Sequence, residues 1–443
     1  MNDQVISDLR PISKVTKPLR QFLKIEVASG IVLLVATLIA VTAANTQFRD
    51  LYKNLWNMTL TFGIDDWKLS YPLWYWVNDG LMTVFFFLVG LEIKREIVSG
   101  ELRDVRRVIS PVVAAIGGAA IPAVIYLLLL GDHPGKQGWA VPMATDIAFV
   151  VGALALLGKR VPHGLKVFLL TLAIVDDIIA VLIIAVFYSA TLNFVWLSIA
   201  AFGVACVVVM NRLGVRTVVG YLIVGAGVWL CTLKSGVHPT ISGVVLGLLT
   251  PAVPLISRNV LGRGLKKALD IVESDLKEDS VKLSDVMEEV NFTTRESLSP
   301  LERFEAGVHP WAAFVIMPIF ALVNAGVEFS TTALLSPVAI AVALALLIGK
   351  PLGIILSLAL VVKVRLGILP GGTNWIAVTG GGCLAGIGFT MSLFVASLSM
   401  DGVLLSNAKA GILVGSAVSG VLGIMLLALS LRKGSQDPVK NKK

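Results

Sequence analysis

Charged residues are scarce in this chain. Only 15% of its 443 residues are Asp, Glu, Lys or Arg, against about 25% in a soluble domain, and the mean hydropathy is +0.85. Its four histidines and three cysteines have no metal-ligand spacing, and Cys206, Cys231 and Cys383 lie within or beside apolar runs. These shortages argue against a soluble protein, a disulfide framework and a transition-metal site. The composition instead predicts an all-α polytopic membrane protein.

Apolar runs of membrane-span length recur along the chain. We count about twelve, and the 41 glycines and 18 prolines suit spans that pack closely and break locally. The runs cover residues 25–44, 76–92, 108–130, 138–158, 164–188, 195–211, 217–232, 237–256, 307–327, 338–361, 376–400 and 407–431.

Lysine and arginine give the spans an orientation. The positive residues behind the formal net charge of +8 gather in alternate connections, which puts both termini in the cytoplasm. The outside connections hold few of them: Arg49, Lys53, Lys68, Lys136 and Lys234. Residues 1–24 lack a signal-peptide core, so we expect the first span to be its own insertion signal. The predicted organisation is a cytoplasmic tail (1–24), spans one to eight (25–256), a charged cytoplasmic connection (258–306), spans nine to twelve (307–431) and a basic cytoplasmic tail (432–443).

Two connections are long. The outer one, 45–75, contains Asp65-Asp66-Trp67 and several aromatic residues, and we expect a small interfacial hairpin that could serve as an oligomer contact. The inner one, 258–306, mixes charges of both signs, as at 273–279, which indicates a solvated and partly helical spacer.

Four charges remain deep within the runs: Asp146, Asp176, Asp177 and Lys350. If Lys350 pairs with one carboxylate, two acids are left without a protein cation. Such a site holds either protons or a cation from solution. Because no His or Cys accompanies the acids, this arithmetic favours a small hard cation that is bound by oxygens and competes with protons.

Asp176 and Asp177 lie in the middle of the apolar run 167–187. Adjacent residues on a helix point about 100° apart, so one carboxylate can face a cation while the other turns to Lys350. The alternative is a buried acid pair in a soluble helix, which the apolar remainder of the chain disfavours.

Two spans carry signs of a break. Proline, threonine and Asp146 stand together at 142–146, where freed carbonyls and a hydroxyl could coordinate a cation, although a proline kink with a satisfied Asp is the alternative. Five glycines fall within the nine residues 380–388, which close helix packing could also explain. These are the fourth and eleventh spans, each the middle of a three-span group (108–188 and 338–431) that enters from the opposite side. That placement predicts inverted-topology repeats with two discontinuous helices.

Seven short motifs resemble the NhaA family of bacterial sodium/proton antiporters, which serves as a standard example of inverted repeats. They are LEIKRE at 91–96, ATDIAF at 144–149, LAIVDD at 172–177, GVHPT at 236–240, HPW at 309–311, GKPLG at 349–353 and GIGFTMS at 386–392. They run in family order across nearly the whole chain. The connection 258–306 is longer than this family leads us to expect.

The resemblance implies two crossed, interrupted helices at mid-membrane. Asp146 would compensate the positive helix ends there and Lys350 the negative ends. Asp177 would be the principal Na+ ligand, with Asp176 switching between Lys350 and the cation and Thr145 close by.

The resemblance also implies a function. The chain would be an electrogenic Na+(Li+)/H+ antiporter of the bacterial inner membrane that exports Na+ for about two H+. It would be no enzyme and would need no cofactor or nucleic-acid partner.

The family's pH response lies at the cytoplasmic funnel. Here the matching candidates are Glu92, Arg95, Glu96 and Glu305, with His238 towards the other side. The alternatives are a solvated helix end for Glu92 and Glu96, and a cap of the eighth span for His238.

Other classes of membrane protein fit less well. An intramembrane aspartyl protease needs its two aspartates on separate helices and no buried lysine beside them. A channel needs a continuous polar lining, which spans so poor in polar groups do not offer. A binding protein without transport would show ligand-dependent stability and no flux.

Overall fold

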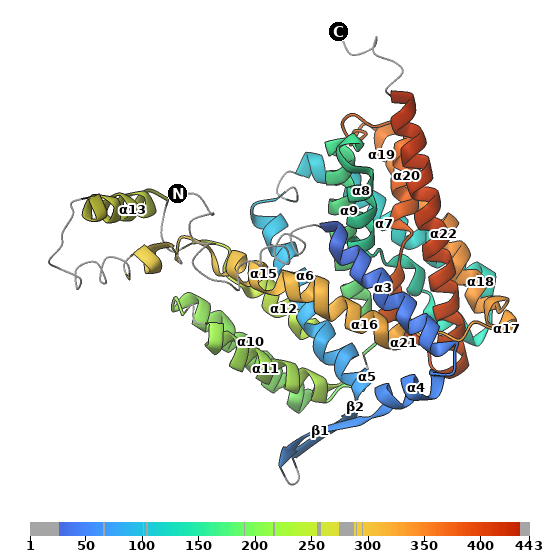
Figure 1. The fold of residues 1–443 in the computed structure, drawn as a ribbon, viewed down its shortest axis with the longest axis horizontal. Coiled ribbons are helices and arrows are strands. Elements are labelled where there is room, and N and C mark those ends of the chain that lie inside the picture. The colour runs from blue at the N-terminus through green and yellow to red at the C-terminus, as the bar shows by residue number, and fades with distance from the viewer. Residues whose placement is uncertain are drawn as a thin grey trace.

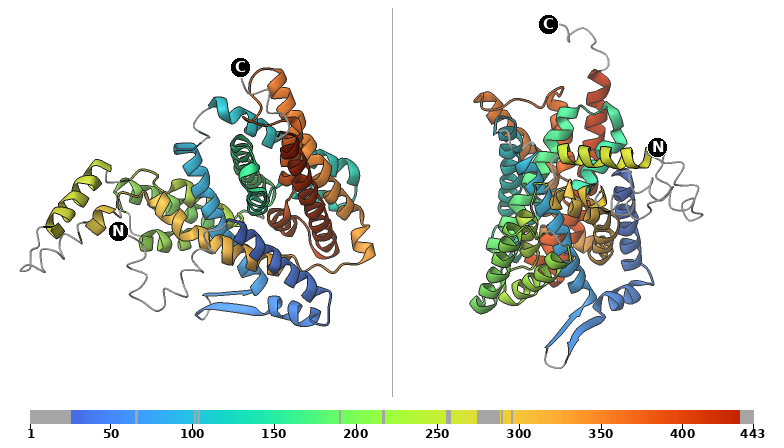
Figure 2. Two further views of the ribbon diagram at one scale, coloured as in Figure 1. Left: turned by 45° about the horizontal axis from the view of Figure 1, so that its top comes forward. Right: turned by 90° about the vertical axis from the view of Figure 1, so that its left-hand side faces the viewer.

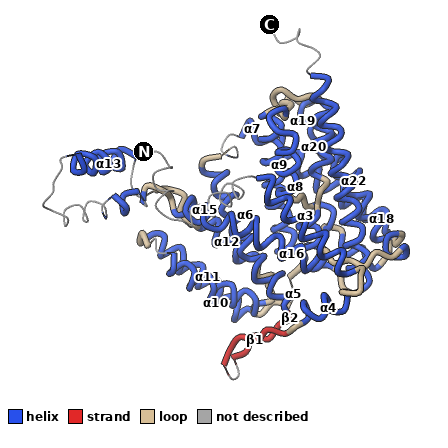
Figure 3. Tube along the Cα trace, in the orientation of Figure 1, coloured by secondary structure: helices blue, strands red, loops and turns tan. Residues whose placement is uncertain are grey.

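The computed structural model describes residues 26–434 apart from 65–66, 101, 103–104, 190, 216–217, 255–257, 274–287, 289 and 295. Helices make up most of this part of the chain, with one two-stranded sheet at its edge (Figures 1 and 3). The two expected tails, Asp65, Asp66 and the charged run at 274–279 fall wholly or largely outside the described residues.

The first half of the chain contains α3 (Glu26–Ala44), α4 (Arg49–Asn57), β1 (Thr59–Ile64), β2 (Trp67–Pro72), α5 (Leu73–Tyr75), η1 (Trp76–Leu81), α6 (Met82–Val98), α7 (Val105–Leu130), η3 (Pro134–Gly138), η4 (Val141–Met143), α8 (Ile147–Leu157), η5 (Gly158–Arg160), α9 (His163–Phe187) and α10 (Phe194–Arg212). The second half contains α11 (Val218–Ser235), α12 (Thr240–Leu249), α13 (Arg258–Glu273), α15 (Pro300–Trp311), η6 (Ala312–Ile316), α16 (Met317–Asn324), α17 (Thr331–Leu334), α18 (Pro337–Leu344), η7 (Ala345–Gly349), α19 (Lys350–Lys363), α20 (Trp375–Ala385), α21 (Phe389–Ser399) and α22 (Gly402–Gly434).

Long apolar helices dominate the described part of the chain. Six are long and apolar enough to cross a membrane, or up to nine if each of three bent helix pairs is one span, and α11 and α12 are shorter apolar helices. Each of the predicted apolar runs overlaps helical backbone. Because a helix satisfies its own backbone hydrogen bonds, this is the architecture of a multi-pass membrane protein.

The helix that contains the ninth apolar run begins at Pro300, before the expected border at residue 307. Ser299 and Glu302 form a capping box, in which the Ser299 hydroxyl accepts from the Glu302 backbone and Glu302 accepts from the Ser299 backbone. With proline at the first helical position, this cap is a strong start signal that hydropathy alone does not show.

The connection after α4 forms an antiparallel hairpin, as the sequence predicts. Strands β1 and β2 pair from Thr59↔Pro72 to Ile64↔Trp67. The hairpin projects from the helical body beside α4 (Figure 1). Aromatic rings gather at its base, where Tyr71 and Tyr75 stack with centroids 4.3 Å apart.

Glycines let α7 and α19 approach closely. A Cβ on Gly353 would come within 2.2 Å of the Gly117 carbonyl oxygen, so no side chain fits there without moving one helix. Small residues at such crossings are typical of membrane helices. The contact holds the start of α19, and therefore Lys350, against α7.

Two helical stretches are broken in the middle of the molecule. The stretches Pro134–Met143 and Ile147–Leu157 meet at a bend of 41°, and Trp375–Ala385 and Phe389–Ser399 at a bend of 44°. These are the fourth and eleventh apolar runs, where the sequence predicts breaks. Both pack among α9, α19 and α22, on the side of the molecule away from α10 and α11 (Figure 1).

Candidate cation-binding site at the helix breaks

The two breaks touch each other directly. The backbone N–H of Asp146 donates to the carbonyl oxygen of Ile387 over 2.7 Å. The rings of Phe149 and Phe389, each in the first turn of the helix that follows its break, lie 5.1 Å apart edge to face. The backbone groups that each break frees are therefore partly satisfied by the other break.

Asp146 serves as a cap for the helices that follow both breaks. Its Oδ1 accepts from the backbone N–H of Phe149 in α8 over 3.4 Å. Its Oδ2 accepts from the backbone N–H of Thr390 in α21 over 3.0 Å, and from the Thr390 hydroxyl. A buried carboxylate thus faces the N-terminal, positive ends of two helices, where a negative charge is stabilised.

Lys350 supplies the buried positive charge of the site. It is 0% exposed, and its Nζ lies 2.6 Å from Oδ2 of Asp176. The same Nζ donates to the carbonyl oxygen of Met143, the last residue of η4. Lys350 therefore contacts the C-terminal, negative end of the first half of one broken helix as well as a carboxylate.

Thr145 joins these groups. Its Oγ1 lies 2.7 Å from Asp176 Oδ2 and 2.9 Å from the carbonyl oxygen of Ala385, at the end of α20. Because a hydroxyl carries one proton, Thr145 donates to one of the two at a time, and its lone pairs stay available for a cation.

Asp177 is the carboxylate with the least compensation. It is 2% exposed, and its Oδ1 has no hydrogen-bond partner among the described residues. Oδ1 of Asp176 is also buried and unpartnered there. Unpartnered buried oxygens are costly unless a proton or a cation satisfies them. The described residues contain no group of three or more His, Cys, Asp or Glu side chains that could hold a metal ion.

Four of the expected pH-response residues lie at the α6–α15 contact. Arg95 forms an ion pair with Glu305 and lies 3.7 Å from Glu96. Glu92 is half-buried on α6, one turn before Glu96, and its charge acts on Arg95, Glu96 and Glu305. Glu92 is also the charged group with the largest electrostatic effect on Asp177. The structure therefore links this group to the aspartate site.

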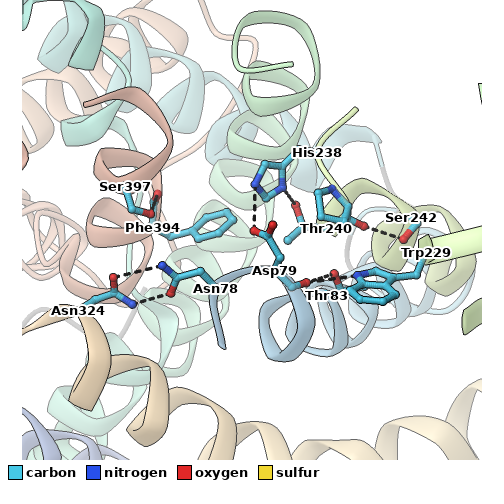
Figure 4. Close-up of polar contacts among 11 residues, drawn as sticks. Asn78, Asp79, Thr83, Trp229, His238, Thr240, Ser242, Asn324, Phe394 and Ser397 are labelled. Carbon is cyan, nitrogen blue, oxygen red and sulfur yellow. Dashed lines mark hydrogen bonds and ion pairs between the residues drawn. The ribbon is translucent and has the colours of Figure 1, made fainter. Parts of the chain in front are cut away.

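His238 lies apart from those four residues, in a second buried polar cluster (Figure 4). Its Nε2 is 3.6 Å from Oδ1 of Asp79, and its Nδ1 is 2.7 Å from Oγ1 of Thr240. Beside it, the carboxamides of Asn78 and Asn324 bond to each other over 2.7 Å.

Sequence reasoning missed Asp79 and Thr390. Asp79 was discounted because it lies within one turn of a predicted span border, yet the π-helix η1 holds it inside the protein, at 8% exposed. A hydroxyl residue in the first turn after the glycine-rich break could have signalled Thr390 as a partner for an acid.

Comparison with known proteins agrees with this architecture. The family described as Na+/H+ antiporter 1 matches residues 20–427. The chain is similar to "Na(+)/H(+) antiporter NhaA" of Rhodopirellula baltica, with 46% identity over 97% of this chain and 98% of that protein. It is also similar to the protein of the same name from Rhizobium meliloti, with 44% identity over 97% and 98%.

A solved structure shares the fold. The sodium proton antiporter MjNhaP1 from Methanocaldococcus jannaschii superposes with a TM-score of 0.50 over 96% of each chain, at 11% identity. The family match and the relatives cover nearly the whole chain, including both breaks and the aspartate pair. This chain therefore belongs to the Na+/H+ antiporter 1 family.

Proposed function

We propose that this chain is a secondary active transporter that exchanges Na+ for H+ across a membrane. The observation that carries the proposal is the pair of buried Oδ1 atoms on Asp176 and Asp177, which lack partners among the described residues. The names of the relatives, which call them Na+/H+ antiporters, support the same activity. Relatives with such names are transporters, so we assign the chain no enzymatic reaction and no cofactor.

The exchange follows from competition at one site. Sodium takes oxygen ligands, and the carboxylates of Asp177 and Asp176 with the hydroxyl of Thr145 supply them. Protonation of a carboxylate removes its charge and most of its strength as a ligand. Protons and Na+ therefore exclude each other, and the loss of one prepares the site for the other.

Lys350 and Asp146 would make this chemistry tolerable inside the membrane. Lys350 is held to Asp176 and to the Met143 carbonyl, so it neutralises Asp176 whenever no cation does. Asp146 is held by Phe149 and Thr390, so it stays at the helix ends. We assign Asp177 the role of principal ligand because it has no such partner.

The finer points of the proposal rest on family resemblance and on charge patterning. The architecture would be twelve spans with inverted repeats, in which the fourth and eleventh spans are discontinuous and crossed. The block 25–256 and the block 307–431 would be joined by the cytoplasmic connection 258–306. Both termini would lie in the cytoplasm of a bacterium, with the protein in its inner membrane.

Transport would be electrogenic. Two protons entering for each Na+ or Li+ exported move one net positive charge inward. The ion pairs around Arg95 and the His238–Asp79 cluster are our candidates for pH regulation. We propose the hairpin in 45–75 as the contact of a homodimer.

Purified protein in liposomes that contain a trapped pH dye tests the exchange. An imposed Na+ gradient should drive a pH change of the opposite sense, and a potential-sensitive dye should report the net charge. Proteolysis or cation binding without flux would contradict the proposal. A Na+ flux without proton movement would indicate a channel.

Cysteine accessibility tests the orientation. A cysteine at exposed Asn54 should react with an impermeant reagent from outside intact cells, and one at exposed Leu366 only after the membrane is opened. Reaction of the Leu366 variant in intact cells would contradict the topology.

A further inference from the structure

Helix α13 stands apart from the helical bundle. It follows α12 after residues 250–257 and lies within the connection that is longer than the resemblance leads us to expect. Two views at right angles show α13 running across the direction of α22, on the side of the molecule away from the hairpin (Figures 1 and 2).

The side chains of α13 separate into two kinds. Leu261, Leu265 and Leu269 recur every four residues and form one stripe, which we call the leucine stripe. Leu265 is 44% exposed and Leu269 is 60% exposed. Arg263 and Lys266, three residues apart and both exposed, lie on a neighbouring strip of the helix. This pattern is typical of helices that lie in a membrane interface.

The protein itself covers only part of α13. A Cβ on Gly264 would meet Thr293 at 3.6 Å, which places the chain after residue 290 against this side of the helix. The outer end of the leucine stripe, at Leu265 and Leu269, stays open. An apolar stripe beside fixed positive charges complements a surface that is apolar below and negative above.

A bilayer surface of this kind is within reach. An extended chain covers at most roughly 3.6 Å per residue, so residues 250–257 hold α13 within about 30 Å of the end of α12. α12 is one of the apolar helices of the bundle and carries no charged residue. Because α13 also lies across the bundle, it is oriented to rest on a leaflet.

We infer that α13 binds anionic phospholipid, with the leucine stripe in the headgroup–acyl boundary and Arg263 and Lys266 at the phosphates. Under the orientation proposed above, this leaflet is the cytoplasmic one. Each lysine or arginine at an anionic surface contributes roughly fivefold to the binding equilibrium. Removing both charges should therefore shift the ratio of docked to undocked α13 by about 30-fold towards the undocked form.

The full-length chain in nanodiscs, one chain per disc, tests this docking. Cys206, Cys231 and Cys383 are replaced by alanine, and a fluorophore is attached at Leu269→Cys or, in a second variant, at Leu265→Cys. The discs contain phosphatidylcholine alone or mixed with phosphatidylglycerol. Lipid-borne nitroxides report burial in the leaflet, and aqueous iodide reports exposure.

In the discs that contain phosphatidylglycerol, nitroxide quenching should rise and iodide quenching should fall at both label positions. Arg263→Gln with Lys266→Gln should reverse both changes, as should high salt. The matched control Lys363→Gln with Arg365→Gln removes the same charge from another connection and should leave quenching unchanged. A thermal melt of each labelled variant checks that it is folded.

Several results would overturn the inference. Iodide access that is equal in both lipid compositions would show that α13 does not dock. Nitroxide quenching that ignores both lipid charge and the double variant would remove the anionic lipid from the explanation. Protection that develops only when two chains share a disc would make the occupant a second copy.

Discussion

The carboxylates of Asp146 and of the Asp176–Asp177 pair are equally buried, yet their surroundings differ. Asp146 receives hydrogen bonds at both oxygens, from Phe149 and from Thr390. Asp176 and Asp177 each keep an oxygen without a partner among the described residues. The first carboxylate completes the fold, whereas the pair is left able to bind something else.

Only the pair therefore has capacity for an ion. An anion that the protein satisfies fully gains little from a cation, because bonds already made must be broken. An anion that the protein leaves unsatisfied gains from either Na+ or a proton. Substitutions on the two sides of this divide should affect transport and stability differently.

The largest effect should come from Asp177→Asn. The amide keeps the size and one acceptor oxygen of the carboxylate but cannot ionise, so proton release on Na+ addition and exchange in liposomes should fall to background. Folding should persist, since neutralising a buried acid is not costly. Asp401→Asn, at an exposed loop position, is the matched control. Exchange at the wild-type rate would shift the site to Asp146 with Asp176.

Next in size is Lys350→Ala. Removing one partner of a buried ion pair leaves the other charge uncompensated, which typically costs about 3–5 kcal/mol. The variant should melt well below the wild type at neutral pH. Lys363→Ala, at the far end of the same helix, should melt normally. Equal melting of Lys350→Ala and wild type at every pH would disprove the importance of the Asp176–Lys350 pair.

Asp176→Asn should have an intermediate effect on transport. Asp177 remains able to ionise, while Lys350 loses its carboxylate partner and becomes a competitor for the site. We expect weakened Na+ binding with an altered coupling ratio, measured as protons released per Na+ bound in detergent. A variant as inactive as Asp177→Asn would mean that the two aspartates act as one ligand.

Asp146→Asn should be milder, because an amide oxygen can still accept from one helix end. Loss of a helix cap costs about 0.5–2 kcal/mol, and Na+ binding should survive. Thr390→Val should lower the melting temperature in the wild type more than in Asp146→Asn, if the two residues act together. Additive effects of the two substitutions would contradict the shared cap.

Much of this divide could be predicted from the sequence. A buried lysine among three acids and a proline–threonine–aspartate run are visible without coordinates, and they locate both the site and one break. Which aspartate Lys350 contacts could not be predicted, because the rotation of α9 is set by packing against α7, α19 and α20. The capping of α21 by Asp146 joins residues far apart in sequence, and no local pattern reports it. Asp79 was missed because a border rule based on hydropathy does not register a π-helix.

The smallest effect should come from an exposed carboxylate, Glu328, which lies outside the spans. Its Oε1 is 2.6 Å from Lys53 Nζ and 2.8 Å from Arg49 Nε, at the contact between α4 and the loop after α16. The hydrogen bond from Lys53, followed by the charges of Lys53 and Arg49, lowers the pKa of Glu328 below its ordinary value of 4.5. A lowered pKa means that the folded state favours the charged form.

The stabilisation by Glu328 is therefore present above its unfolded pKa and is lost as the pH falls through its folded pKa. Glu328→Gln should lower the melting temperature slightly at neutral pH, by the 1 kcal/mol or less (about) that exposed pairs contribute, and the difference should vanish in acid and shrink in high salt. Asp50→Asn, also exposed on α4, should show no such pH-dependent difference. An effect of Glu328→Gln as large as that of Lys350→Ala would mean that partner charges at the surface and in the buried site weigh equally, against the comparison drawn between satisfied and unsatisfied groups.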